Sequence, residues 1–479
     1  MHAFAPGTDL MQAVVHELSR IVGASACIVD PDPDDPRLVD ERANYHGRAA
    51  AIVTPGTTAE VAAVVTVCAD AGLAIVPQGG NTGYCGGATP DAHGRSIVLC
   101  LARLNRIRAI DPAAATLTAE AGVVLADAQA AAADRNLLLP LGMGSQGSCQ
   151  LGGNLSTNAG GLSVLRYGTA RDLVAGLEVV LPDGRILSDL RGLRKDNTGY
   201  DLKQLFLGAE GTLGIITAAV LRLQPQPRST LTAWLAIEHV DQALRVLGEL
   251  RSGVGDCVTS CEYVAGDAFA LLLSRFPDFQ DPLDGHTGDH VLVELMAFDD
   301  GEALRAGFER IVAGALEAGT ICDAVVAQTE TQRRALWTLR ESIPAAEKLA
   351  GGSVKHDVSV SLGALPELAR VLCERTPERF PGTRLSVYGH VGDGNLHFNV
   401  LAPPGSDAAM YRRNHAAAIS AFVHATTLAS GGSFSAEHGI GQLKRGLLAQ
   451  SAAPLEMELM RRLKHMLDPR GIMNPGKVV

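Results

Sequence analysis

Residues 77–87 read PQGGNTGYCGG and directly follow Leu73–Val76, a short apolar run that predicts a buried strand. Five of these eleven residues are glycines, so consecutive backbone N–H groups can curl around an anion without hindrance from Cβ atoms. A flexible loop is the plainer alternative. The position directly after a strand favours a loop that cradles a phosphate or diphosphate.

The residues before this loop predict a strand, helix, strand unit. Ala49–Val53 is a short apolar strand, and Thr57 with Glu60 forms a capping box that opens a helix to about Ala71. Gly72 supplies the stop. A unit of this kind delivers the glycine-rich loop to the edge of a sheet.

A second glycine-rich stretch covers residues 142–161. Gly142, Gly144 and Gly147 match the dinucleotide fingerprint G-x-G-x-x-G, which should open a helix and be followed by an acidic residue about 20 positions on. The further glycines of this stretch are expected to break any helix, and no Asp or Glu lies between Asp134 and Asp172. We therefore reject a Rossmann site for nicotinamide.

The pattern changes after Pro225 and Pro227, where a second α+β domain is expected to begin. Its predicted strands are 230–237, 291–298 and 353–361, and its predicted helices are 240–250, 302–318 and 330–349. The expected divisions are an N-terminal segment 1–47, a first domain 48–227, a second domain 228–434 and a C-terminal helical segment 435–479.

Composition excludes several classes of protein. The 479 residues are 47% hydrophobic and 19% charged, which is typical of a globular protein, and the net charge of −11 argues against a nucleic-acid partner. No apolar run reaches the about 20 residues of a transmembrane helix, and Met1–Gly23 lacks the apolar core of a signal peptide. Nine scattered cysteines suggest reduced thiols. These features predict a cytoplasmic location.

Residues 384–400 predict two strands joined at an Asp393-Gly394 turn. That register sets His390 directly opposite His397, with Asn399 on the same face. A single strand histidine is more often structural than a ligand. Two that face each other suit one metal ion, and Glu437 in the segment SAEHGIG is the best third ligand, because two histidines and a carboxylate form an open divalent site.

The glycine-rich segments, with Arg166-Tyr167-Gly168 and the segment GAEGTLG at 208–214, resemble the FAD domain of vanillyl-alcohol-oxidase-type flavoproteins over almost the whole chain. The resemblance implies an α+β fold. It comprises a PCMH-type FAD-binding domain of two α+β subdomains, a ferredoxin-like-type substrate domain and a small C-terminal helical segment that closes on the flavin. Asn81 stands where family members often have a histidine bonded to the flavin, so the resemblance implies noncovalent FAD.

The resemblance also implies which residues contact FAD. They are Pro77, Gly79, Gly80, Asn81, Thr82, Gly83, Pro140, Gly144, Ser145, Gly147, Ser148, Gly152, Gly153, Asn154, Thr157, Asn158, Gly160, Gly161, Tyr167, Gly168, Glu210, Gly211, Gly214, Ile215, Ile216 and Asn474.

The segments HVGDGNLH and SAEHGIG resemble those of FAD-dependent D-2-hydroxyacid dehydrogenases, most closely the D-2-hydroxyglutarate dehydrogenases. This resemblance implies a divalent metal, usually zinc, on His390, His397 and Glu437, with His438 as the catalytic base. It also implies that Arg340, Lys355 and Asn399 bind the substrate, and that the two cations bind its distal carboxylate. Either cation could instead be a surface charge or an ion-pair partner.

One residue departs from the family pattern. Pro344 stands where the family commonly has a threonine, which leaves the length of the substrate side chain open. The resemblance also implies an electron acceptor such as electron-transfer flavoprotein, and a homodimer.

The expected reaction is oxidation of a D-2-hydroxyacid, D-2-hydroxyglutarate to 2-oxoglutarate being favoured, with hydride passing to the flavin. A D-lactate or glycolate dehydrogenase of the same build is the nearest alternative. A metal-dependent hydrolase would leave the glycine-rich segments unexplained. A flavin-binding redox sensor would not be reduced by hydroxyacids.

Overall fold

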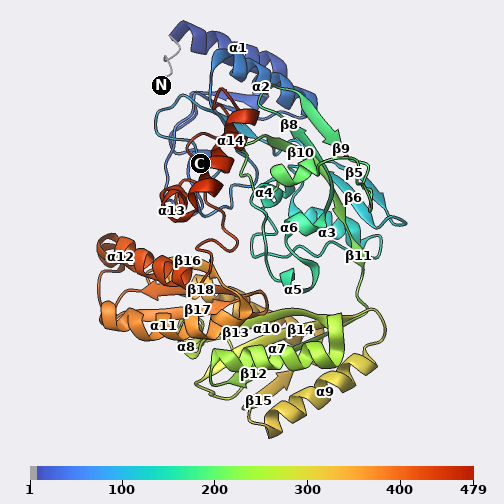
Figure 1. The fold of residues 1–479 in the computed structure, drawn as a ribbon, viewed down its shortest axis with the longest axis vertical. Helices are drawn as coiled ribbons and strands as arrows, with labels where there is room; N and C mark the ends of the chain where they lie inside the picture. Colours follow the sequence, from blue (N-terminus) through green and yellow to red (C-terminus); the bar gives the residue numbers. More distant parts are fainter. Residues whose placement is uncertain (1–7) are drawn as a thin grey trace. The chain divides into compact units, whose positions relative to one another are not determined.

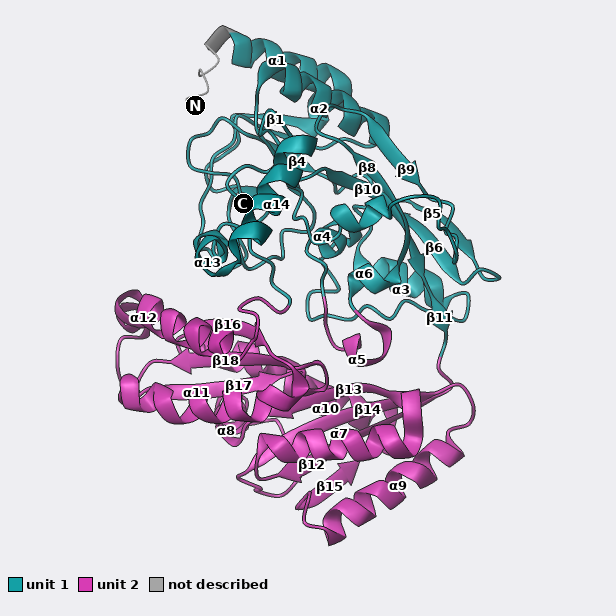
Figure 2. Ribbon diagram, viewed as in Figure 1, with its two compact units in different colours: residues 1–159, 169–226, 437–479 teal, residues 160–168, 227–436 magenta. Residues whose placement is uncertain are grey.

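The computed structural model describes residues 8–479. Residues 1–7, part of the expected N-terminal segment 1–47, lie outside the described residues. The chain divides into two compact units (Figure 2). Unit 1 contains residues 1–159, 169–226 and 437–479, and unit 2 contains residues 160–168 and 227–436.

The first sheet of unit 1 delivers the glycine-rich loop. Its strand order is β1-β2-β4-β3, with bounds Cys27–Val29, Ala51–Val53, Ile97–Cys100 and Ile75–Gln78. β2 and β3 both run parallel to β4, and helix α2 (Thr58–Ala71) connects them. The Thr57 side chain accepts a hydrogen bond from the Glu60 N–H, and Gly72 caps the helix in the left-handed region, so the predicted helix limits are confirmed.

The second sheet of unit 1 is antiparallel, in the order β5-β6-β10-β8-β9 (Figure 1). Its strands are Ile107–Asp111, Thr116–Glu120, Ile215–Arg222, Val174–Val180 and Ile186–Asp189, and a two-residue pair joins β7 (Leu137–Leu138) to β11 (Gln224–Pro225). The other helices of unit 1 are α1 (Thr8–Val22), α3 (Leu125–Ala133), α4 (Leu151–Ser156), α6 (Ala170–Leu173), α13 (Arg445–Ser451) and α14 (Pro454–Leu467).

Helix α4 corrects one expectation. The glycines after residue 147 were expected to break any helix, yet Gly152 and Gly153 lie inside α4. A Cβ on Gly152 would lie 2.7 Å from the Cβ of Ala121 and 3.1 Å from its carbonyl oxygen. Glycine therefore lets this short helix approach the neighbouring backbone, and that packing outweighs a helix propensity about 1 kcal/mol below that of alanine.

Unit 2 is built on a seven-stranded antiparallel sheet in the order β15-β12-β14-β13-β17-β18-β16. The strands are Asp323–Val326, Ser229–Ile237, Asp289–Ala297, Val258–Val264, Arg384–Gly389, Asn395–Leu401 and Ser353–Ser359. The helices of this unit are α5 (Val164–Tyr167), α7 (Val240–Val254), α8 (Gly266–Arg275), α9 (Glu302–Glu317), α10 (Glu330–Leu349), α11 (Leu365–Arg379) and α12 (Ala408–Ala429).

Each face of this sheet has its own core, as the period of two along a strand requires. On β12, Leu231, Ala233, Leu235 and Ile237 pack with residues of α7, α9, α11 and α12. Trp234 and Ala236 point to the other face and pack with residues of α8 and α10. The face under α10 also carries the polar residues considered below, so we call it the α10 face.

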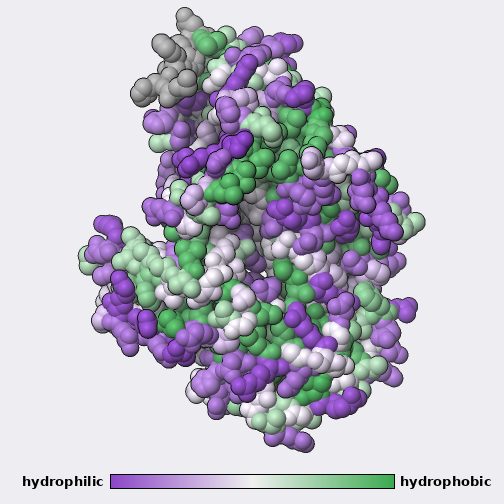
Figure 3. Space-filling model, in the orientation of Figure 1, coloured by the Kyte–Doolittle hydropathy of each residue, from purple (hydrophilic) through white to green (hydrophobic). Residues whose placement is uncertain are grey.

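None of the helices formed by residues 8–479 combines the length and the apolar content that crossing a bilayer requires. On the face of the molecule seen in Figure 3, polar and apolar residues are interspersed. The mixture of helices and strands confirms the predicted α+β class.

Candidate active site

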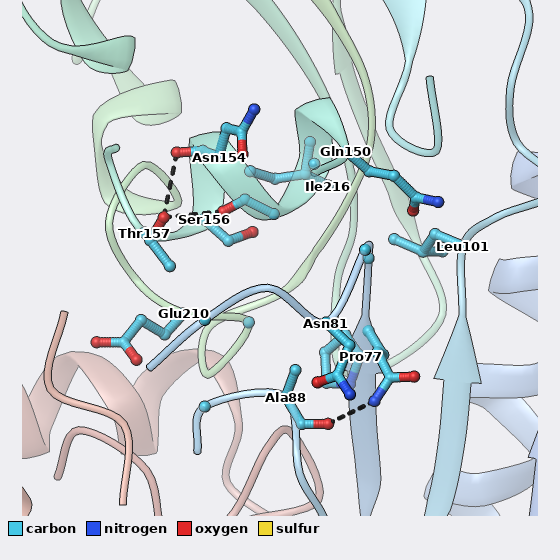
Figure 4. A pocket seen from close by; sticks show the side chains of 18 of the residues that line it. Pro77, Asn81, Ala88, Leu101, Gln150, Asn154, Ser156, Thr157, Glu210 and Ile216 are labelled. Carbon is cyan, nitrogen blue, oxygen red and sulfur yellow. Dashed lines mark hydrogen bonds between the residues drawn. The ribbon is translucent and has the colours of Figure 1, made fainter. Parts of the chain in front are cut away.

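Unit 1 contains a pocket with about 850 Å³ of empty space, its open mouth included. Three chain segments wall it: residues 77–88, residues 150–157 and residues 210–216, joined by Leu101 and His438. Figure 4 shows Glu210 and Gln150 on separate segments of the pocket lining, with Pro77 in β3 and Asn81 on the loop that follows it. Segments more than 50 residues apart in sequence thus form one pocket.

Glycines allow these segments to approach each other. A Cβ on Gly80 would collide with the carbonyl oxygen of Ser148 and lie 3.0 Å from the Cα of Cys149. Gly211 has φ +70°, and a Cβ there would lie 2.7 Å from Pro77 Cγ. Parts of the pocket wall are therefore bare backbone, which offers N–H donors to an anion.

The residues present fit a diphosphate-containing cofactor such as FAD. The glycine walls form a cradle that side chains would fill. The Gln150 side chain is nearly buried, and its Oε1 has no hydrogen-bond partner among the described residues. A buried acceptor of this kind on a pocket wall is expected to find its donor in a ligand or a water molecule.

The structure brings only some of the predicted FAD residues to the pocket. Those that line it are Pro77, Gly79, Gly80, Asn81, Thr82, Gly83, Gly152, Gly153, Asn154, Thr157, Glu210, Gly211, Gly214, Ile215 and Ile216. Those that do not line it are Pro140, Gly144, Ser145, Gly147, Ser148, Asn158, Gly160, Gly161, Tyr167, Gly168 and Asn474. Gly160, Gly161, Tyr167 and Gly168 belong to unit 2.

Asn474 does not line the pocket, but it binds two residues that do. Its Nδ2 donates to the carbonyl oxygens of Gly87, at 2.9 Å, and Glu210, at 2.7 Å, and both residues line the pocket. The chain tail also forms a bridge to Ile75 of β3 through Met473. The tail is therefore part of the scaffold that holds two pocket walls together.

Asn81 occupies the loop position predicted to exclude a covalent flavin bond. Its backbone is left-handed, with φ +54°, which asparagine tolerates better than most residues. Its Nδ2 donates to the carbonyl oxygens of Val39, at 2.8 Å, and Pro36, at 3.1 Å. The side chain thus ties the loop to the preceding segment.

His438 also lines this pocket. Its ring meets Tyr84 edge-on, with centroids 4.9 Å apart, and the Arg42 guanidinium lies 4.0 Å from the centroid of the Tyr84 ring. The residue predicted as the base and the loop predicted to hold FAD therefore belong to one pocket wall.

Glu210 fixes the turn that follows His438. Its carboxylate accepts the N–H groups of Ile440, at 2.7 Å, and Gly441, at 2.8 Å. Burial raises the pKa of this carboxyl, although the two N–H groups and Lys444 act in the opposite direction. We expect Glu210 to orient the His438 turn as well as to line the pocket.

In unit 2 the hairpin is present, but its predicted register is wrong. His397 of β18 pairs with Tyr388 of β17, not with His390. His390 lies outside the strand and precedes a 3-10 turn, Val391–Asp393, which Gly394 ends with φ +80°. The 3-10 turn makes the connection between β17 and β18 longer than the predicted two-residue turn, and it places Val391 in the core.

The two imidazoles nevertheless lie together. Their ring centroids are 5.4 Å apart and the rings are nearly perpendicular, at 81°. The His390 Nδ1 lies 2.7 Å from Oε1 of Glu262, and the His397 Nδ1 lies 3.8 Å from Oδ1 of Asp357. In metal sites a carboxylate hydrogen-bonded to one ring nitrogen fixes the tautomer that ligates through the other. Glu262 is placed to do this for His390, and the two neighbouring imidazoles fit a divalent ion.

Arg340 is buried, with 5% of its surface exposed, and is paired with a carboxylate. Its Nε and Nη2 lie 3.0 Å and 2.8 Å from Oε2 of Glu262, and its guanidinium stands 4.7 Å from the centroid of the Tyr388 ring. Glu262 therefore joins Arg340 to His390. Burial acts to raise the pKa of this carboxyl, yet His390 and Arg340 together lower it.

Lys355 is paired in the same way. Its Nζ donates to Oε2 of Glu347 at 2.6 Å, and Asn399 Nδ2 donates to Oε1 of that carboxylate at 2.8 Å. The Asn399 Oδ1 accepts the His356 N–H at 3.3 Å. Both predicted substrate cations thus make ion pairs within the protein, the alternative left open by the sequence.

Glu437 is held near His397 by the chain itself. The Ala436 N–H donates to the carbonyl oxygen of Asp357 at 3.4 Å, and Asp357 of β16 pairs with His397 of β18. Consecutive Cα atoms are about 3.8 Å apart, so the residue after Ala436 starts close to this strand pair.

Sequence reasoning missed four polar residues: Gln150, Glu262, Glu347 and Asp357. One signal was available for Glu262, because a charged residue within the apolar strand VTSCEYV needs a buried partner. Nothing in the sequence around Gln150 indicates that its side chain is turned toward a ligand.

Comparison with known proteins identifies the family. The family model "FAD binding domain" matches residues 49–189, and "FAD linked oxidases, C-terminal domain" matches residues 226–478. A mitochondrial D-2-hydroxyglutarate dehydrogenase of Bos taurus is 37% identical over 470 residues, 96% of this chain and 82% of the other. A Schizosaccharomyces pombe mitochondrial protein, provisionally named a D-lactate dehydrogenase, is 35% identical over 100% of this chain and 92% of its own length.

The solved structures agree on the fold. A p-cresol methylhydroxylase with bound substrate superposes with a TM-score of 0.79 and 20% identity, covering 98% of this chain and 97% of the other. At this identity the match supports the fold alone.

The predicted cytoplasmic location is wrong by the same comparison, because the Bos taurus and Schizosaccharomyces pombe relatives are named mitochondrial. The prediction rested on a missing secretory signal and a missing membrane span. Neither feature bears on import into an organelle, which uses amphipathic targeting segments of another composition.

The second family model covers more than half of the chain, and both relatives exceed 30% identity over nearly all of it. The chain therefore belongs to the family of FAD-linked oxidases that includes the curated D-2-hydroxyglutarate dehydrogenases.

Proposed function

We propose that the protein is an FAD- and metal-dependent dehydrogenase that oxidises a D-2-hydroxyacid, with D-2-hydroxyglutarate as the favoured substrate and 2-oxoglutarate as the product. The observation that carries this proposal is the presence of His438 on the wall of the glycine-lined pocket. Relatives that are named D-2-hydroxyglutarate dehydrogenases support the substrate class.

Bound FAD would supply the hydride acceptor, and a divalent metal, Zn²⁺ by family resemblance, would supply a Lewis acid. The residues proposed to hold FAD are those of the pocket walls, chiefly the backbone of residues 79–83, 152–153 and 210–211. His390, His397 and Glu437 offer two imidazoles and a carboxylate for the metal. FAD is proposed to be noncovalent, because Asn81 offers no nucleophilic ring nitrogen.

His438 is proposed to take the proton of the substrate hydroxyl on its imidazole. A positioned base of this kind contributes about 10²- to 10⁴-fold to the rate. Glu210 and the edge-on contact with Tyr84 restrict the turn and the ring of His438, which favours one orientation for proton transfer.

Arg340, Lys355 and Asn399 are proposed to bind the substrate, the two cations at its distal carboxylate, and Asn399 also holds Glu347 and thereby Lys355. Within residues 8–479, Nη1 of Arg340 has no hydrogen-bond partner, which supports this role. Because both cations are already paired with glutamates, D-lactate is the second candidate substrate, and the name of the yeast relative favours the same alternative.

Two further parts of the proposal come from the resemblance alone: an electron carrier such as electron-transfer flavoprotein as the acceptor, and a homodimer as the assembly. The divisions 48–227 for the cofactor, 228–434 for the substrate and 435–479 for the segment that closes on the flavin combine the resemblance with the change of sequence pattern after Pro225 and Pro227.

Anaerobic bleaching of the flavin tests the function. We expect D-2-hydroxyglutarate to reduce the purified yellow protein faster than D-lactate or glycolate, and L-enantiomers to reduce it little. Acid denaturation should release all of the FAD into solution. If no D-2-hydroxyacid bleaches the flavin, the proposed reaction is wrong.

Replacement of His438 tests the base. We expect His438→Asn to lower the rate of flavin reduction about 100-fold or more under saturating substrate, with unchanged FAD content. His93→Asn, on an exposed loop of unit 1, is the matched control and should behave as wild type. Undiminished reduction by His438→Asn would remove His438 from the base assignment.

A further inference from the structure

Two buried glutamates of the unit 2 sheet look alike but have different partners. Glu262 on β13 and Glu294 on β14 both lie on the α10 face, and each pairs with an arginine of α10. Glu294 binds Arg333, at 2.9 Å, and Trp337, at 2.7 Å. Only Glu262 of the two also reaches a histidine predicted to ligate the metal.

We propose that Glu262 is a positioning residue of the metal site, which orients the His390 ring and is itself held in place by Arg340. This inference rests on the proposed function, because it takes His390 as a ligand. It assigns Arg340 a second task besides the substrate: without any substrate present, the arginine should already stabilise the metal site.

The geometry gives each carboxylate oxygen of Glu262 its own partner. Oε1 of Glu262 lies 2.7 Å from Nδ1 of His390, while Oε2 lies 2.8 Å to 3.0 Å from two nitrogens of Arg340. Only 1% of the Glu262 side chain is exposed, so water cannot replace either partner readily. An ionised carboxylate is acceptor-only, so it selects the His390 tautomer that carries its proton on Nδ1 and leaves the Nε2 lone pair for a metal.

The second cation supplies a contrast. Lys355 bonds to Glu347, and the other partners of this carboxylate are Ser353 and Asn399, neither of which is a predicted metal ligand. Arg340 and Lys355 are both proposed to meet the substrate, yet only Arg340 is linked through a carboxylate to a metal ligand. The two cations should therefore differ in their effect on the metal when no substrate is bound.

Zn²⁺ affinity tests the proposal on the FAD-loaded protein, after metal extraction and in competition with a chromophoric chelator. In Glu262→Gln the amide oxygen can still accept from Arg340, but the amide NH₂ faces Nδ1–H of His390. We expect Zn²⁺ affinity to fall 10- to 100-fold, the usual loss for an outer partner of a metal ligand. Glu294→Gln should stay within about twofold of wild type.

The two cations are compared in the same assay, without substrate. Arg340→Met is expected to weaken Zn²⁺ binding about fivefold, because Glu262 loses the partner that aims it. Lys355→Met is the matched control and should leave Zn²⁺ affinity unchanged. An arginine that serves the substrate alone would give the same result for both variants.

Histidine-labelled wild-type protein gives a second measurement that needs no variant. With Zn²⁺ bound, the ¹⁵N spectrum should show His390 protonated at Nδ1 and metal-bound at Nε2. Metal binding through Nδ1 would overturn the proposal even if Glu262→Gln fails to fold. Equal Zn²⁺ affinity in wild type and Glu262→Gln would overturn it alone, whereas a wild-type protein that binds no Zn²⁺ would overturn the proposed metal site as well.

Discussion

The pocket of unit 1 is lined in part by glycine backbone, whereas the α10 face of unit 2 carries paired charged side chains within an apolar core. In the pocket, glycines let chain segments approach until an added Cβ would strike a carbonyl oxygen or a proline ring. On the α10 face, Glu262, Glu294 and Glu347 each bind a cation and further polar side chains. The two regions therefore hold charge by different means.

The difference determines how each region fails. A backbone wall has no charge to lose, and it is disturbed by added volume. A buried ion pair is disturbed in another way, because the loss of one member leaves a buried charge without its partner. Substitutions that add a methyl group should act in unit 1, and substitutions that remove a charge should act in unit 2.

The largest effect is expected for Gly80→Ala in the pocket wall. The new Cβ would collide with the Ser148 carbonyl oxygen, so the loop must move away from the second glycine-rich segment. We expect the free energy of unfolding to fall by about 3 kcal/mol and the protein to be purified without flavin. The ratio of flavin to protein absorbance and a thermal unfolding curve measure both.

Gly142→Ala is the matched control for Gly80→Ala. Gly142 belongs to the second glycine-rich stretch, but no atom lies within 4 Å of its added Cβ. Full flavin content is expected there. If Gly80→Ala kept its flavin and its wild-type melting temperature, close approach of the backbone would not be what shapes the pocket.

A smaller effect is expected for Glu210→Gln, because the buried Glu210 carboxylate holds the turn after His438. The amide can accept only one of the two N–H groups of Ile440 and Gly441. One lost hydrogen bond of about 1 to 2 kcal/mol should lower kcat about tenfold. Flavin content should stay near wild type, as measured by absorbance.

Glu60→Gln is the control for Glu210→Gln. The Glu60 carboxylate also accepts a backbone N–H, that of Gly56, but at the start of α2 and away from the pocket. Its kcat should equal that of wild type. An equal loss of kcat in both variants would contradict a specific role for the Glu210 clamp.

The sequence was informative where the structure depends on local patterns. The Thr57 cap and the stop at Gly72 set the limits of α2, although the Glu60 carboxylate accepts the Gly56 N–H and so does not complete the predicted capping box, and α10 begins and ends where its sequence predicts. The glycine-rich loop was placed after a strand, which β3 confirms. These features depend on a few neighbouring residues, so composition and spacing are enough to predict them.

Features that depend on distant contacts were missed or wrong. The register of the hairpin depends on how Val391 packs into the core, which no turn pattern encodes. Glu262 and His390 are 128 residues apart in the chain, and only the sheet brings them together. The glycines of α4 looked like helix breakers, because Ala121, the close neighbour that Gly152 accommodates, lies in another segment.

The smallest effect is expected from a proton on the α10 face, where His290 is fully buried and accepts a hydrogen bond from Trp234 Nε1 at 3.0 Å. Burial, with a further contribution from the nearby His286, lowers the pKa of His290 to about 4 from 6.5. The folded protein thus binds fewer protons than the unfolded chain between these values, so stability falls as pH falls. Between pH 7 and pH 5.5 the loss is about 1 kcal/mol.

His290→Gln, whose amide oxygen can accept from Trp234, should remove that part of the pH dependence in urea unfolding curves, whereas the exposed control His93→Gln should retain it. If His290→Gln left the pH dependence of the free energy of unfolding unchanged, the buried side chains around His290 in unit 2 would contribute no more to it than the glycine walls of unit 1.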